Sequence, residues 1–163
     1  MEKTLTRSFR PHNGRVTNAE RALAIATAAL LLGLSAAAAA MPGVTVEKPW
    51  MRFIIKSRPA AGYFTLKNDT GSAIDLVGAT SSACGMMMLH QSKEVNGIEK
   101  MLSVKSISVP AHGSVSFTTG GYHLMCMSPG ETVKVGANVP VTLKFAHGGT
   151  VTVQFPVKGA GAM

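Results

Sequence analysis

Short runs of β-prone residues, each bounded by turn residues, fill the chain after residue 40. Gly, Pro, Asn or Asp interrupts these runs every few positions, and helical periodicity is nearly absent. About eight to ten short strands in roughly 115 residues predict an antiparallel β-sandwich or barrel. The expected strands cover residues 44–46, 50–55, 62–67, 74–79, 86–91, 98–104, 114–118, 122–127, 139–145 and 150–157.

The first 40 residues have the pattern of an export signal. Basic residues between Lys3 and Arg21 precede an apolar run over 22–34, and several A-x-A cleavage sites lie in 35–40. The apolar run is shorter than the span of about 20 residues that crosses a bilayer. We therefore expect a signal peptide over 1–40, and no membrane insertion after its cleavage near Ala40. An uncleaved anchor is the alternative.

The remaining chain has the size of one ordinary domain. We expect a single β-domain over 41–157, followed by a flexible Gly/Ala tail over 158–163, and a monomer. The net charge of +8 comes from basic residues scattered along the chain, which indicates a solvated surface and no nucleic-acid interface. No C-x-x-C, no G-x-S-x-G and no carboxylate pair near a histidine is present, so we expect no enzyme activity.

Two histidines and two methionines form the spacing H-x10-M-x21-H-x-M, with His90, Met101, His123 and Met125 at its four positions. Thioether sulfur is soft and neutral, so it suits Cu(I) well and Mg²⁺ or Ca²⁺ poorly. Zinc sites in proteins use Cys, His or carboxylate ligands instead of Met. The set therefore predicts one Cu(I) per chain.

Local strand geometry brings these residues together in pairs. Asn96-Gly97 between two apolar runs predicts a hairpin in which His90 lies opposite Ser103. Met101 is then the diagonal neighbour of His90 on the same face, about 7–8 Å away. Residues two apart in a strand share a face at about 7 Å, so His123 and Met125 form a second pair.

Other methionines and histidines are weaker candidates for metal ligands. Met88 has the strand parity of His90, so it lines the rim of the site or packs beside it. Met127 shares the face of His123 but lies about 13–14 Å from it, just before the expected turn at 128–130. His112 and His147 stand in turns, where we expect them to be exposed and without a metal.

Cys84 and Cys126 allow two interpretations. In an oxidising compartment a pair of cysteines usually becomes a disulfide. The alternative is a pair of thiolates that bind copper or carry electrons. Strand parity directs Cys126 away from the face of His123 and Met125, which favours the disulfide without excluding the thiolates.

The spacing of the four ligands resembles the PCu(A)C-type periplasmic copper chaperones over about residues 44–157. The segments G-G-Y-H-L-M at 120–125, P-V-T-L-K-F at 140–145 and T-V-T-V-Q-F-P-V at 150–157 share this resemblance. It implies an all-β, cupredoxin-like Greek-key domain in the periplasm that holds Cu(I). It also implies a copper-accepting partner, such as a respiratory oxidase subunit or an assembly factor. The resemblance does not settle the state of the cysteines, and the G-A-G-A-M tail lacks the His/Met-rich extension that holds Cu(II) in some members.

Two other functions compete with a copper chaperone. A blue-copper electron-transfer protein needs two His and a Cys thiolate around the metal, with a weak axial Met. An intense blue Cu(II) form would favour this alternative. A metal-free β-sandwich interaction module would instead fail to bind Cu(I) against a chelator.

Overall fold

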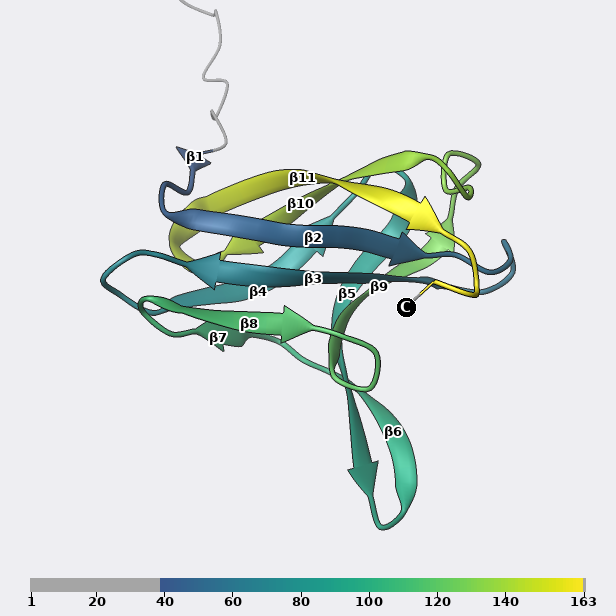
Figure 1. Cartoon of the computed structure of the whole chain (residues 1–163), viewed down its shortest axis with the longest axis horizontal. Helices are drawn as coiled ribbons and strands as arrows, with labels where there is room; N and C mark the ends of the chain where they lie inside the picture. The colour runs from purple at the N-terminus through teal and green to yellow at the C-terminus, as the bar shows by residue number, and fades with distance from the viewer. Residues whose placement is uncertain (1–38, 163) are drawn as a thin grey trace, which may run out of the picture. The chain divides into compact units, whose positions relative to one another are not determined.

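Residues 39–162 are described in a computed structural model (Figure 1). The predicted signal peptide lies outside these residues except for its last two positions. No helix in the described part is both long enough and apolar enough to span a bilayer. The elements in order are β1 (Ala39–Ala40), β2 (Val44–Arg52), β3 (Ala60–Asn68), β4 (Ile74–Thr80), β5 (Cys84–Val95), β6 (Ile98–Ser103), β7 (Ile107–Val109), β8 (Gly113–Phe117), β9 (Tyr122–Pro129), β10 (Asn138–Phe145), the 3-10 turn η2 (Ala146–Gly148) and β11 (Gly149–Lys158).

The strands follow the hydrogen-bonded order β6-β5-β9-β8-β3-β2-β11-β10-β4-β7. Strand β11 connects β10 to β2 in this order, because it pairs with β10 along most of its length and with β2 at its end. Neighbours that are distant in sequence, such as β5 and β9, show the crossover connections of a Greek key. The predicted all-β, cupredoxin-like class is confirmed. Not every pair is antiparallel, however, since β2 and β11 run parallel at Met51 and Val157.

An aromatic cluster lies in the hydrophobic core. Phe64 stacks on Phe117 with ring centroids 4.1 Å apart, and Phe155 meets Phe64 edge-on at 5.7 Å. Leu124 and Cys126 on β9 are fully buried in the same core. Because side chains alternate along a strand, His123, Met125 and Met127 lie on the outer face of β9.

Strands β3 and β5 are longer than expected, and β2, β7 and β9 differ further from the sequence-based expectation. The runs at 44–46 and 50–55 are one strand, β2, with a bulge between Glu47 and Trp50 where Lys48 takes a φ of 50°. Strand β7 was not expected; its three residues pair with β4. Strand β9 continues to Pro129, which pairs with Cys84, so the expected turn at 128–130 begins later than predicted.

The hairpin of β5 and β6 has the predicted register. Asn96 and Gly97 form its tip with φ values of 56° and 76°, as a type I′ turn requires, and His90 lies opposite Ser103. Figure 1 shows β6 and the end of β5 extending beyond the other strands. All six residues of β6 are exposed, so Met101 reaches the body of the protein from a projecting arm.

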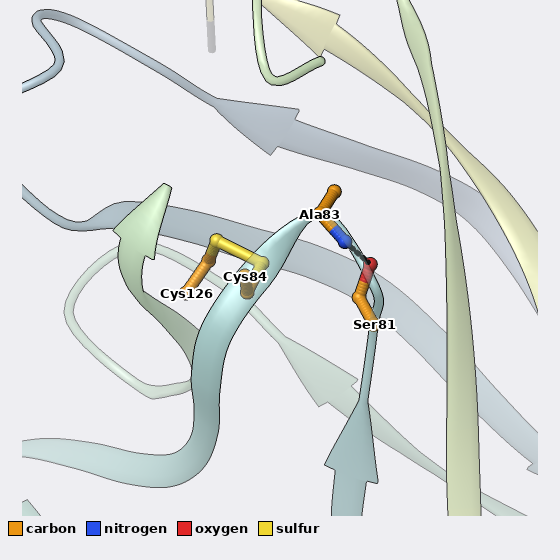
Figure 2. Close-up of a disulfide and its surroundings, with 4 residues drawn as sticks. All are labelled: Ser81, Ala83, Cys84 and Cys126. Atoms are coloured by element: carbon orange, nitrogen blue, oxygen red, sulfur yellow. Dashed lines mark hydrogen bonds between the residues drawn. A yellow bond between two sulfur atoms is a disulfide. The ribbon is translucent and has the colours of Figure 1, made fainter. Parts of the chain in front are cut away.

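A disulfide joins Cys84 at the start of β5 to Cys126 in β9, with 5.4 Å between the two Cα atoms (Figure 2). Both cysteines are buried. The Ala83 N–H beside the bond donates to the Ser81 hydroxyl at 3.2 Å. Of the two interpretations of the cysteine pair, the structure therefore contains the disulfide, on the inner face of β9.

Candidate metal centre

Strands β5 and β9 place two histidines side by side. His90 pairs directly with His123 in the antiparallel ladder, and the ring centroids are 5.9 Å apart with the planes at 82°. Strand alternation predicts His90 beside Met101 and His123 beside Met125, but local spacing does not connect the two pairs. The β5–β9 ladder makes that connection, because it sets one hairpin beside a strand that follows much later in the chain.

Each of these imidazoles has a buried nitrogen without a partner in the part of the chain that the structure describes. The His123 side chain is 4% exposed, and its Nδ1 lies 3.0 Å from the Gly121 carbonyl. A carbonyl accepts, so Nδ1 carries the proton and Nε2 keeps its lone pair. His123 Nε2 and His90 Nδ1 have no hydrogen-bond partner in the described chain. Buried polar atoms are normally paired, and this arrangement is the one found in metal-ligating histidines.

The electrostatics of the pair favour neutral rings. Burial, and secondly the neighbouring His123, lower the pKa of His90 below its ordinary value. Metal ligation requires unprotonated imidazole, so a lowered pKa keeps His90 competent to bind at more acidic pH.

A cavity of about 430 Å³ lies over this part of the sheet, and Met101, His123 and Met125 line it. Met101 is 55% exposed on the arm, whereas His123 is nearly enclosed. Three of the four predicted ligands thus meet at one cavity, and the fourth, His90, lies directly opposite His123. Two imidazole nitrogens and two thioether sulfurs are a neutral, soft donor set that fits Cu(I). Among the described residues, no group of three or more His, Cys, Asp or Glu side chains is placed to hold a metal ion.

One wall of the cavity is aromatic and basic, which the sequence pattern does not predict. Tyr63 on β3 lies 6.4 Å from His123 between ring centroids, and Trp50 packs on Tyr63 at 4.8 Å. Arg52 donates to the Tyr63 hydroxyl at 2.9 Å and its guanidinium lies over the same ring. Arg58 also lines the cavity. The only available signal was the alternation within β2 and β3, which does not indicate which strand lies beside β9.

The remaining histidines and methionines take other places. Met88 lies directly opposite Met125, and Met127 lies opposite Met86. Met127 lines a separate hollow of about 380 Å³. His112 and His147 are exposed in their turns, as expected.

Comparisons with known proteins identify the family of this chain. Residues 44–157 match the family described as "Putative lipoprotein LpqE-like". The chain belongs to this LpqE-like family. "Putative lipoprotein Lxx21020" from Leifsonia xyli subsp. xyli is 35% identical to the LpqE-like chain over 147 residues, covering 83% of this chain and 88% of that protein. A protein of Rickettsia prowazekii, RP573, is 29% identical over 103 residues, covering 60% of this chain and 57% of that one.

Solved structures similar to this LpqE-like chain include PCuAC domains and DR1885. The Cu(I) form of DR1885 from Deinococcus radiodurans is 32% identical, with a TM-score of 0.54 over 80% of this chain and 85% of that one. The apo PCuAC domain of PmoF2 has a TM-score of 0.63 and 23% identity, over 76% of this chain and 96% of that domain, which shows the shared fold. The resemblance to the PCu(A)C type is therefore confirmed.

Proposed function

We propose that this LpqE-like protein is a Cu(I) carrier that binds one ion at His90, Met101, His123 and Met125. The observation that supports this most is the His90–His123 pair, in which each ring has a buried nitrogen without a partner among residues 39–162. Met101 and Met125 line the cavity at His123, so they are the soft donors that share this cavity with the pair. The Cu(I) form of the related DR1885 structure supports copper as the ion.

Transfer to an acceptor follows from the unequal exposure of the ligands. Met101 is 55% exposed on the β5–β6 arm, whereas His123 is 4% exposed. A weakly basic thioether at an exposed position is the first ligand that an incoming donor can replace. Because all four ligands are neutral, their stepwise replacement leaves no charged group buried without a partner.

The setting we propose is the periplasm, with a copper centre of a respiratory oxidase, or its assembly factor, as the acceptor. The signal-like segment over 1–40 and the disulfide between Cys84 and Cys126 both support an exported, oxidising location. The relatives named as lipoproteins support the cell envelope. The protein acts by binding and release, and no catalytic step is assigned to it.

An anaerobic Cu(I) titration against a chelator, combined with X-ray absorption, tests this proposal. We expect one tightly bound ion with about two nitrogen and two sulfur neighbours. The matched variants are His123→Gln, which removes a buried ligand, and His147→Gln, which changes an exposed turn residue. Loss of tight binding only in His123→Gln supports the site, whereas equal binding by both variants contradicts it. Metal transfer to an isolated oxidase copper domain then tests the acceptor.

The blue-copper alternative lacks its thiolate in this fold. The sequence has two cysteines, and both are in the disulfide on the inner face of β9. The cavity at His123 lies on the outer face, so a Cys ligand would require both reduction and rearrangement of the strand.

A further inference from the structure

Methionines continue along the outer face of β5 and β9 beyond the candidate metal centre. Met88 lies directly opposite Met125, and Met86 lies directly opposite Met127. Four of the ten methionines in the chain thus form two cross-strand pairs that are neighbours on the outer face. This concentration of thioethers lies in register with the His90–His123 pair, so it extends the same row of soft donors.

These side chains face away from the hydrophobic core. Leu89 and Cys126, which alternate with them, are 3% and 0% exposed, and Met87 packs against the core. Met86 is 55% exposed, and Met88 and Met127 are half-buried. Met86 therefore leaves more than half of its surface open to solvent.

The hollow at Met127 adjoins the candidate metal centre. Arg58 and Pro59 line both the cavity at His123 and the hollow of about 380 Å³ at Met127. Lys56 on this hollow is paired with Glu131, whereas Arg58 adds a positive charge to the shared wall. Repulsion from Arg58 lowers the affinity of any cation here relative to an uncharged wall.

We propose that Met86, Met88 and Met127 form a second, weaker soft-metal site that Cu(I) occupies on its way to or from the main centre. Directly opposite Cβ atoms lie about 4.5–5.5 Å apart and diagonal positions about 7–8 Å apart. Unbranched Met side chains with three rotatable bonds are long enough to span these separations, so the three sulfurs can reach one ion. Three neutral thioethers select Cu(I) or Ag(I) over harder cations. The role in transit rests on the proposed function, whereas the site itself is measured independently.

The test uses the full chain labelled with ¹³C at the methionine methyls and titrated with Ag(I), then anaerobically with Cu(I). The first equivalent should shift the Met101 and Met125 methyl signals. Further metal should shift the Met86, Met88 and Met127 methyls together, with one apparent dissociation constant at least tenfold weaker. Methyls of these three residues that stay unshifted at excess metal, or that follow different constants, would overturn the second site.

Variants distinguish this site from ordinary surface packing. The double variant Met86→Leu/Met127→Leu should lose the second phase at the Met88 methyl and keep the first, and Met→Leu preserves volume well enough to retain the fold. Met87→Leu, at the core-packed neighbour, should keep both phases. A second phase that persists in the double variant contradicts the assignment. If the His123→Gln variant loses the first phase of the titration and retains the second, the two sites are separate. If the wild type shows the second phase without the first, only the proposed function is refuted.

Discussion

His90 and His123 lie directly opposite each other on β5 and β9, with ring centroids 5.9 Å apart and planes at 82°. His123 Nδ1 is occupied by the Gly121 carbonyl, so the tautomer that remains presents Nε2 as a donor. The free nitrogen of each ring is buried, and no described group satisfies it. Leaving such atoms unpaired costs stability, on the order of 1–3 kcal/mol each, which a bound ion would relieve.

The first prediction concerns stoichiometry and selectivity. One set of two imidazoles and two thioethers should hold one Cu(I) per chain against a competing chelator. Zn²⁺ should bind far more weakly, because thioethers are poor zinc ligands. Metal analysis after chelator challenge measures both quantities. Two Cu(I) ions that survive the same challenge would refute a single tight centre, since the ion at the three-methionine site should be removed.

The second prediction separates two neighbouring methionines on β9. Met125→Leu should keep the fold and lower Cu(I) affinity at least tenfold, which is about 1.4 kcal/mol. Met127→Leu should change the affinity of the tight site several-fold at most, because residue 127 lies about 13–14 Å from His123 along the strand. Each side chain lines a different hollow, which supports this division.

Competition titrations of both variants against one Cu(I) chelator provide the measurement. The two substitutions are chemically identical and two residues apart, so each controls for the other. A silent Met125→Leu together with a damaging Met127→Leu would mean that the ligand pair on β9 is wrongly placed.

The third prediction concerns the disulfide. Cys84 and Cys126 are separated by 42 positions, so closing this loop should stabilise the fold by about 3–4 kcal/mol on the chain-entropy model. The double variant Cys84→Ala/Cys126→Ala should lose that much free energy of unfolding in denaturant titrations. Its Cu(I) affinity should stay within a few-fold of wild type, since the sulfurs lie on the inner face of β9. A large loss of affinity in a variant that remains folded would instead favour the thiolate interpretation.

The fourth prediction is a pH dependence of the apo protein. Burial lowers the pKa of His90 in the folded state, so between that pKa and the ordinary value of about 6.5 the unfolded chain binds more protons. The free energy of unfolding should therefore contain the full contribution of neutral His90 above about pH 6.5, and it should fall as the pH drops below that value. His90→Gln should reduce this slope in denaturant titrations at several pH values. The same slope in the variant and the wild type would show that His90 is not its source.

The sequence alone determined the features that depend on neighbours along the chain. The Asn96-Gly97 tip set the β5–β6 register, because a two-residue turn with positive φ values allows only one pairing of the flanking strands. Alternation along β9 likewise placed Cys126 and His123 on opposite faces. In each case the geometry follows from local bond angles and the pleat, so a few residues are sufficient.

Only the tertiary structure decided which distant strands lie beside these local elements. The pairing of β5 with β9 puts His90 opposite His123, buries their nitrogens, and aligns Met86 with Met127. The aromatic and basic wall of Tyr63 and Arg52 arrives from β2 and β3 in the same way. Pairing between strands that are distant in sequence depends on how the entire core packs, because many registers satisfy the same alternation. For that reason the sequence predicts the four candidate ligands as two local pairs, and the fold places one pair beside the other.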